Sequence, residues 1–218
     1  MKIINLGETH SLLNPYLAQI RDKTVQKDSL RFRRNLERIG EIFAYEISKK
    51  LNYTPKEVET PLGIAQEQVV ADQLVLATIL RAGLPVHQGL LNFFDNAQNA
   101  FVAAYRKYGK GNECELLIEY QSAPSLEGKT LVIADAMLAS GASMIMTYQS
   151  LVGYGEPVHT HIVCPVASRD GVENLSKNLP HKRVTLWVGA IDEELTNHSY
   201  IVPGLGDAGD LAYGSKTS

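Results

Sequence analysis

An acidic residue and a loop of small, hydroxyl-bearing residues follow one apolar run of the sequence. Residues 130–134 read TLVIA, Asp135 comes next, and Ser140 and Ser143 flank a Gly-Ala pair. Backbone N–H groups and hydroxyls at the start of a helix form a cradle for phosphate, and the helix dipole favours the anion. Asp135 could hold the hydroxyls of a sugar attached to that phosphate. An Asp-initiated turn with a Ser N-cap fits the same residues, so this loop alone leaves both interpretations open.

Charged residues also follow other apolar runs. Arg81 follows QLVLATIL, Arg106 follows AFVAAY, and Asp192 comes shortly after RVTLWVGA. A guanidinium presents a planar fork of donors that matches phosphate. A carboxylate can hold sugar hydroxyls or a hydrated Mg²⁺ ion. These residue types predict a site for a phosphorylated, metal-bound ligand.

The stretch YIVPGLGDAGDLAYG, residues 200–214, is rich in glycine and carries the carboxylates Asp207 and Asp210. Glycine tolerates positive φ and lets the backbone approach a flat ligand closely. Backbone N–H and C=O groups could then read the edge of a base that contains an imide. A tight glycine-rich surface turn is the alternative that these residues leave open.

The elements that must position these residues alternate along the chain. Phe32, Ile39 and Ile47 recur at helical spacing and predict a helix over residues 29–50 with Ser29 as its N-cap. Two prolines and a glycine then break the periodicity. Strands are expected at 73–80, 100–105, 116–121, 130–134, 160–167 and 183–190. Helices are expected after RAGLP up to about Phe94, after the loop that follows Asp135 up to about Val152, and over 169–179.

This alternation predicts an α/β fold with a mostly parallel sheet flanked by helices, in one domain over residues 1–218. In such sheets ligands bind beyond the carboxyl ends of the strands, where the charged residues fall. The 218 residues are 44% hydrophobic and 21% charged, as in soluble globular proteins. The net charge of −3 argues against a general attraction to nucleic acid or anionic membranes. No apolar run has transmembrane length and the first residues lack a signal-peptide core, so a cytoplasmic location is expected.

Four segments together resemble the uracil phosphoribosyltransferase family: ILRAGL, YR, DAMLASGAS and YIVPGLGDAGD, with RFRRN in an N-terminal arm. Their order and spacing agree over nearly the whole chain. The resemblance implies the type I phosphoribosyltransferase fold, with a hood that binds the base. It also implies transfer of the 5-phosphoribosyl group of 5-phosphoribosyl 1-diphosphate to N1 of uracil, which yields UMP and diphosphate.

The resemblance also implies roles for individual residues. The residues expected to be catalytic are Asp135, Arg106 and Asp207. Those expected to bind phosphoribosyl diphosphate are Arg81, Arg106, Asp135, Ala136, Met137, Leu138, Ala139, Ser140, Gly141, Ala142, Ser143 and Asp207. Those expected to bind uracil are Tyr200, Ile201, Gly206, Asp207 and Ala208. Mg²⁺ is the expected cofactor, held mainly by the substrate diphosphate and water, with no protein side chain as a dedicated ligand.

The chain departs from the family's usual loop at Ala136, Ser140 and Ala142, where proline, threonine and glycine are usual. Ala142 adds a Cβ near the phosphate and disfavours positive φ. The family further implies a homodimer or homotetramer and a GTP effector. Arg31, Arg33 and Arg34 could serve that effector, although an exposed helix face explains these residues equally well.

Other functions compete with this interpretation. Purine-specific relatives usually carry two adjacent acids where this chain has Asp135 and Ala136, and orotate would need a cation that YIVPGLGDAGD lacks. An RNA-binding regulator on the same fold would show a basic face, which the net charge of −3 disfavours. His159 and His161 alternate on one strand face, but no third ligand completes a metal site.

Overall fold

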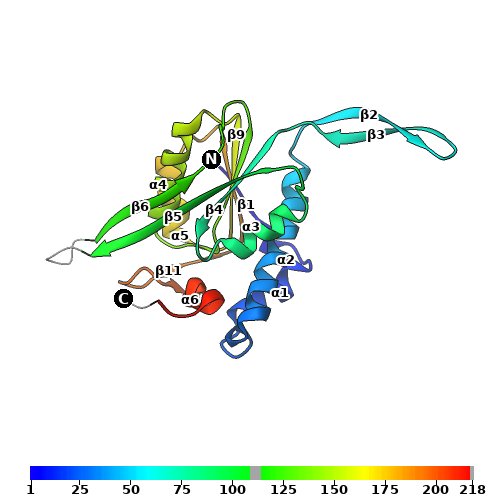
Figure 1. The fold of residues 1–218 in the computed structure, drawn as a ribbon. Coiled ribbons are helices and arrows are strands. Elements are labelled where there is room, and N and C mark those ends of the chain that lie inside the picture. Colours follow the sequence, from blue (N-terminus) through cyan, green and yellow to red (C-terminus); the bar gives the residue numbers. More distant parts are fainter. Residues whose placement is uncertain (109–113, 217–218) are drawn as a thin grey trace.

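A central eight-stranded sheet organises the chain (Figure 1). The computed structural model describes residues 1–108 and 114–216, without the side chains of residues 105–108 and 114–116. Across the sheet the order is β1 (Lys2–Asn5), β10 (Val184–Asp192), β9 (His159–Ser168), β7 (Thr130–Ala134), β4 (Leu74–Leu80), β5 (Gln98–Tyr108) and β6 (Cys114–Ser122), and β8 (Met137–Leu138) pairs with β9. Among the described strands of this sheet, only β5 and β6 pair antiparallel. The predicted mostly parallel α/β sheet is therefore confirmed.

The continuous apolar runs form strands because both faces of the sheet are covered. Successive side chains of a strand point to opposite faces, so Leu76 and Val132 join one core while Val75 and Leu131 join the other. The first core includes residues of α1 (Leu13–Arg21), α2 (Ser29–Ser48) and α3 (Leu84–Leu91). The second includes residues of α4 (Ala142–Leu151) and α5 (Arg169–Asn178).

The start of α2 differs from the sequence prediction. The helix begins at Ser29, but its N-cap is Asp28, whose carboxylate accepts a hydrogen bond from the backbone N–H of Arg31 at 3.1 Å. The expected Ser29 cap is therefore wrong. A carboxylate at this position satisfies a free N–H group and also complements the positive end of the helix dipole.

A hairpin of β2 (Tyr53–Thr60) and β3 (Gly63–Val70) projects from the body of the molecule (Figure 1). The sequence predicted only a break here. Most of its residues are exposed, so neither strand shows the burial that marks the strands of the main sheet. Pro55 is tolerated because a two-stranded ribbon has two free edges.

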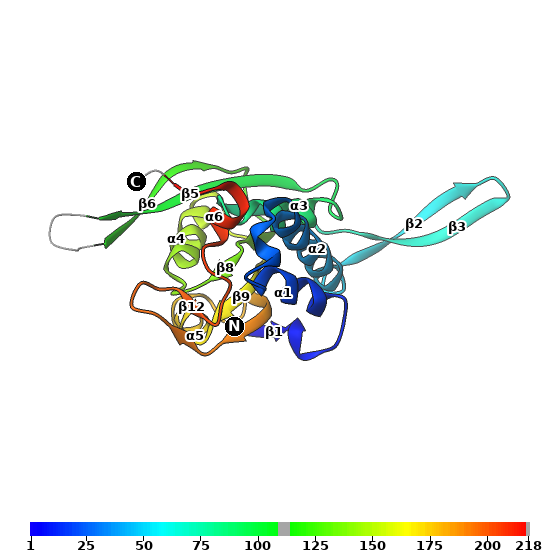
Figure 2. The ribbon, with the colours of Figure 1, turned by 90° about the horizontal axis from the view of Figure 1, so that it is seen from below.

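The C-terminal segment lies across the carboxyl edge of the sheet. It contains β11 (Glu194–Leu195), β12 (Ile201–Val202) and α6 (Ala208–Tyr213). Figure 2 looks onto this edge and shows α6 beside α2, which it contacts. The short 3₁₀ turns Leu6–Glu8, Val25–Lys27 and Val152–Tyr154 complete the described elements. The glycine-rich stretch is thus partly regular structure, placed where the sheet presents its strand ends.

Candidate active site at the carboxyl edge of the sheet

The loop after β4 brings Arg81 into contact with the C-terminal segment. Arg81 Nη2 lies 3.2 Å from Asp210 Oδ1 and also donates to the carbonyl oxygen of Gly214 at 3.2 Å. A Cβ placed on Gly209 would lie 3.2 Å from Asp207 Oδ1 and 3.6 Å from Arg81 Nη2. Two expected site residues that are far apart in sequence, Arg81 and Asp207, therefore flank one point of the molecule.

The β4 loop also packs tightly against the end of β7. A Cβ on Gly83 would lie 2.7 Å from the carbonyl oxygen of Ala134, the residue before Asp135. No larger residue fits at Gly83 unless the two loops move apart. The close approach of these loops places Arg81 and Asp135 at the same edge of the sheet.

Asp135 is half-buried at the end of β7. Its backbone N–H donates to the carbonyl oxygen of Val163 at 3.1 Å, and its Oδ1 accepts from the N–H of Ala136 at 2.7 Å. Burial raises the pKa of the Asp135 carboxyl from 3.8 to about 7, against the opposing N–H groups of Ala136 and Met137. No described basic side chain pairs with this carboxyl. Its negative charge is therefore poorly compensated until a ligand arrives.

Residues 136–143 form the expected loop, and some of its side chains are buried while others are accessible. Ala136 and Leu138 are buried in the core, so they can reach a ligand only through their backbone. Ser140 and Ser143 are half-buried, and Ala142 is exposed at the start of α4. The loop thus presents backbone N–H groups and hydroxyls at a helix N-terminus.

Ala142 was expected to occupy a backbone position with positive φ, but that position belongs to Gly141, the residue before it. Gly141 has φ of +79°, whereas Ala142 lies within α4 and is not among the described residues with positive φ. The expected strain at Ala142 is therefore wrong, because a glycine already occupies the left-handed position.

The start of α5 holds this loop in place. Ser168 Oγ donates to the carbonyl oxygen of Ala139 at 2.6 Å and accepts from the N–H of Gly171 at 2.9 Å. Asn174 Nδ2 donates to the carbonyl oxygen of Ser140 at 2.8 Å. The roles of Ser168 and Asn174 could not be predicted from the sequence, since neither residue belongs to a local pattern that marks it as a loop anchor.

The C-terminal segment exposes some of its expected residues and buries others. Ile201 and Ala208 are each 4% exposed and belong to the core, so their backbone groups alone could face a base. Gly206 and Asp207 are exposed, and so is Tyr200. Asp207 Oδ1 caps α6 by accepting from the N–H of Asp210 at 3.0 Å.

Arg106 lies in β5, opposite Leu116 of β6. Its side chain is outside the described part of the structure, so its expected contact with diphosphate stays a prediction.

Asp192 is not a free carboxylate at the ligand edge, contrary to the grouping made from the sequence. It is 8% exposed and forms an ion pair with Arg21 at 2.8 Å. It also accepts a hydrogen bond from the N–H of Gly204 at 2.9 Å. Arg21 was missed because the two partners are 171 positions apart, which no local pattern reveals.

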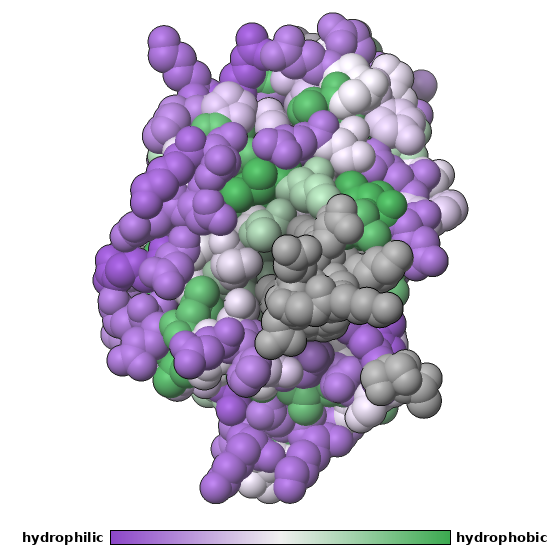
Figure 3. Space-filling view, turned by 90° about the vertical axis from the view of Figure 1, so that its left-hand side faces the viewer, coloured by the Kyte–Doolittle hydropathy of each residue, from purple (hydrophilic) through white to green (hydrophobic). Residues whose placement is uncertain are grey.

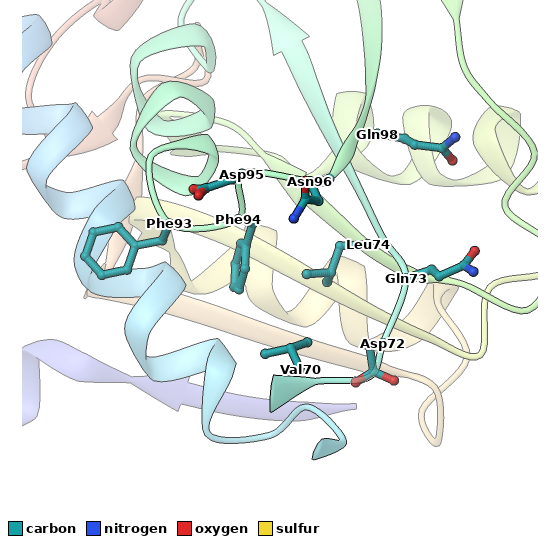
Figure 4. A pocket seen from close by; sticks show the side chains of 10 residues that line it. Val70, Asp72, Gln73, Leu74, Phe93, Phe94, Asp95, Asn96 and Gln98 are labelled. Atoms are coloured by element: carbon teal, nitrogen blue, oxygen red, sulfur yellow. The ribbon is translucent and has the colours of Figure 1, made fainter. Parts of the chain in front are cut away.

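Outside this edge, a separate cavity of about 430 Å³ opens at the amino ends of β4 and β5 (Figure 4). Leu74, Phe94 and Asp72 line it, and none of the expected site residues does. Because β4 and β5 run parallel, this cavity lies at the edge opposite Arg81.

Figure 3 shows that the side of the molecule on the left of Figure 1 exposes mainly hydrophilic side chains.

Comparison with known proteins identifies the family of the chain. The family model described as uracil phosphoribosyltransferase matches residues 8–215. The chain belongs to the uracil phosphoribosyltransferase family. Curated relatives bear the same name: one from Porphyromonas gingivalis is 52% identical over 99% of this chain and 100% of its own length. Another, from Pyrococcus furiosus, is 35% identical over 91% of this chain and 84% of its own length.

Solved structures share the fold of this chain. The AQ2163 protein from Aquifex aeolicus is 30% identical, with a TM-score of 0.86, and the match covers 99% of this chain and 100% of that one. A hypoxanthine phosphoribosyltransferase from Staphylococcus aureus matches 73% of this chain and 74% of its own, at 16% identity and a TM-score of 0.51. That second likeness supports the type I phosphoribosyltransferase fold alone.

None of the helices in the described part of the chain combines the length and the apolar character that a membrane span requires.

Proposed function

We propose that the carboxyl edge of the sheet transfers the 5-phosphoribosyl group of 5-phosphoribosyl 1-diphosphate to N1 of uracil, forming UMP and diphosphate. The observation that carries the proposal is the meeting of Arg81 and Asp207 at one point of this edge, beside the end of β7. Family membership over residues 8–215 supports the choice of reaction.

The proposed donor site uses the ends of two strands. N–H groups and hydroxyls of residues 139–143 would hold the 5-phosphate at the start of α4, where the helix dipole favours an anion. Asp135 would accept hydrogen bonds from the ribose hydroxyls. Arg81 and Arg106 would bind the diphosphate through charge-assisted hydrogen bonds.

The proposed reaction breaks the bond between the anomeric carbon and diphosphate and forms a bond from that carbon to N1 of uracil. Positive charge develops on the ribose ring, and the carboxylate of Asp135 would stabilise it. Arg81 and Arg106 would stabilise the leaving diphosphate. The protein must also align the two reactants and exclude water, which would otherwise compete as the nucleophile. No covalent protein nucleophile is needed.

We propose Mg²⁺ as the cofactor, and the residues present fit it. Asp135 and Asp207 offer hard carboxylate oxygens, the ligand type that Mg²⁺ prefers. Within residues 1–108 and 114–216, no group of three or more His, Cys, Asp or Glu side chains could hold a metal ion. The substrate diphosphate and water would therefore supply most of its ligands. When bound, the ion supplies positive charge to the diphosphate oxygens.

A base-exchange assay with labelled uracil, cytosine, orotate and hypoxanthine tests the proposed function. Fixed backbone groups that match the O2–N3–O4 edge of uracil cannot rotate to suit cytosine, which would meet two hydrogen-bond conflicts of about 1–3 kcal/mol each. We expect kcat/KM for cytosine to be lower by at least about a hundredfold. Comparable rates with cytosine and uracil would reopen the choice of substrate.

We also propose that the chain acts as a homo-oligomer, a dimer or a tetramer, through the β2–β3 hairpin. The hairpin exposes apolar side chains, among them Leu62, which is fully exposed, and Ile64, which is 68% exposed. An isolated two-stranded hairpin is at best marginally stable in water, so packing against a second copy of the chain would stabilise it. The cytoplasm is the proposed location.

A GTP effector is the last part of this proposal. A groove of about 550 Å³ between α2 and α3 is lined by Arg33, Arg34 and Tyr213 among others, and two guanidinium groups suit an anionic nucleotide. Arg33 donates to the carbonyl oxygen of Ala212 at 2.6 Å, whereas Arg34 pairs with Glu37. Initial rates with and without GTP, in the wild type and in Arg34→Gln, test this part. We expect activation that the variant loses, and wild-type rates unchanged by GTP would remove it.

A further inference from the structure

A largely buried ion pair joins two segments that lie far apart in the sequence. Arg21, the last residue of α1, donates from Nη1 to Asp192 Oδ2 at 2.8 Å and from Nη2 to Asp192 Oδ1 at 2.9 Å. The side chain of Arg21 is 22% exposed and that of Asp192 is 9% exposed. A two-bond fork of this kind fixes the relative orientation of both groups as well as their distance.

The same ion pair holds both backbone polar groups of Gly204. The N–H of Gly204 donates to Asp192 Oδ2 at 2.9 Å, and its carbonyl oxygen accepts from Arg21 Nη1 at 3.1 Å. Gly204 has φ of +54°, and a Cβ there would lie 2.2 Å from the carbonyl oxygen of Ile201. The direction of the chain at this turn is therefore set by the ion pair and by the absence of a side chain.

Three of the residues expected to bind uracil, Gly206, Asp207 and Ala208, follow this turn. Leu205 comes next and is held through its carbonyl oxygen by Gln26, at 3.3 Å. Gly206 and Asp207 follow and are exposed, and α6 starts immediately after them. Because the chain enters these two exposed residues from a fixed turn, the position of their backbone groups depends on Gly204.

We propose that Arg21 is a positioning residue for the base: through Asp192 it sets the path of residues 204–208 and thereby the affinity for uracil, without contact with either substrate. The inference rests on the proposed function, in which residues 200–208 bind uracil. The other proposed donor contacts come from Arg81, Arg106, Asp135 and residues 139–143, and no described hydrogen bond joins Arg81 to Arg21 or Asp192. Asp207 alone among the expected donor-binding residues lies within 204–208, so loss of Arg21 should weaken uracil much more than the donor.

The test compares Arg21→Met and Arg21→Lys with the wild type by steady-state kinetics. For Arg21→Met we expect KM for uracil to rise at least about tenfold and KM for phosphoribosyl diphosphate to stay within about twofold, since residues 204–208 carry most of the expected base contacts and only one expected donor contact, Asp207. Arg21→Lys should recover part of the loss, because an ammonium can reach one carboxylate oxygen but does not reproduce the planar fork.

The matched control is Arg169→Met. Arg169 makes a two-bond fork to Glu193, the neighbour of Asp192, but this pair is exposed and no described hydrogen bond ties it to residues 200–208. Both KM values should stay at wild-type levels in this variant. Asp192→Asn is measured in parallel, so that the inference can still be tested if Arg21→Met fails to fold. The amide oxygen of the introduced asparagine would still accept a hydrogen bond from the N–H of Gly204, but the charge that pairs with Arg21 would be lost. It should show the same uracil-specific change at smaller size.

Two results would overturn the inference. One is an equal change of both KM values in the folded Arg21 and Asp192 variants, and the other is a lower melting temperature with unchanged KM for uracil. Either would make the ion pair purely structural. A wild-type protein that does not use uracil would instead overturn the proposed function, so the two failures are distinguishable.

Discussion

Among the single residues of the proposed site, Asp135 is a half-buried carboxyl that no described basic side chain neutralises. We expect Asp135→Asn to fold and to lose most of the transfer activity, because an amide keeps the shape but cannot stabilise positive charge on the ribose. Steady-state rates at saturating substrates, with circular dichroism as the check on folding, measure this. A near-normal rate would remove Asp135 from the proposed mechanism.

The raised pKa of Asp135 also predicts a pH dependence of stability. The folded state holds the proton more tightly than the unfolded state, because the pKa rises from 3.8 to about 7. The contribution of this group to the free energy of unfolding is therefore complete below about pH 4 and is lost as the pH rises to about 7. Relative to Asp135→Asn, the ligand-free wild type should lose stability over that range. Urea unfolding of both proteins at several pH values measures this loss. If the difference in the free energy of unfolding between the two proteins stayed constant with pH, the raised pKa of Asp135 would be contradicted.

Arg81 is the other residue whose role can be separated by substitution. We expect Arg81→Ala to raise the dissociation constant of phosphoribosyl diphosphate about tenfold to a hundredfold, since a charge-assisted hydrogen bond is worth about 1.5–3 kcal/mol. Uracil affinity should change little. Calorimetry with each ligand measures both.

Asp210→Asn is the control for Arg81. It weakens the contact of Arg81 with Asp210 but keeps the guanidinium available to the ligand. Donor affinity should not fall in this variant. If Arg81→Ala weakened uracil and left the donor unchanged, the two proposed subsites would have to be exchanged.

At the level of elements, the segment from β12 to α6 combines a fixed turn with an exposed stretch. Gly206 has φ of +91° and no atom within 4 Å of a Cβ placed on it. We expect Gly206→Val to abolish use of uracil while donor binding stays measurable, because a branched side chain blocks close approach of the base to the backbone. Rates with uracil and calorimetry with the donor test this.

Gly206→Val could also lose activity because a side chain at positive φ strains the backbone, so this effect needs its own control. Gly128 serves as the control, because its φ is +71° and a Cβ there also meets open space. It lies just before β7, at the amino edge of the sheet. Gly128→Val should cost similar stability and keep the uracil rate, and equal losses of activity in both variants would point to strain alone.

For the whole molecule, the carboxyl edge carries the proposed reaction and the projecting hairpin carries the proposed assembly. We expect Leu62→Glu to raise the dissociation constant of the oligomer about tenfold to a hundredfold, since burial of such a side chain is worth about 1.5–3 kcal/mol. Sedimentation equilibrium measures it. Leu12→Glu is the control, because Leu12 is 70% exposed on the body rather than on the hairpin. A monomeric wild type would remove the hairpin from any assembly role.

Local patterns in the sequence were enough to predict the α/β sheet, the two strands that Arg81 and Asp135 follow, and the family. Apolar runs such as TLVIA are local patterns, and burial on both faces of a parallel sheet requires them, so the strands can be predicted without knowledge of their partners. The segments that carry the resemblance are also continuous in sequence. The reaction could therefore be inferred before the fold was known.

Which polar residues lie exposed at the proposed site, and which form buried ion pairs, became clear from the three-dimensional structure. Asp192 and Asp207 both follow strand ends or turns in the sequence, yet Asp192 is buried by Arg21 and Gly204 while Asp207 stays exposed. The isolated hairpin lacks the alternating burial that marks a strand, and its pairing shows only in three dimensions. The burial of a residue and its charged partners depend on segments that are distant in sequence. An aspartate after an apolar run or a turn can therefore be either a buried ion-pair partner, like Asp192, or an exposed carboxylate, like Asp207.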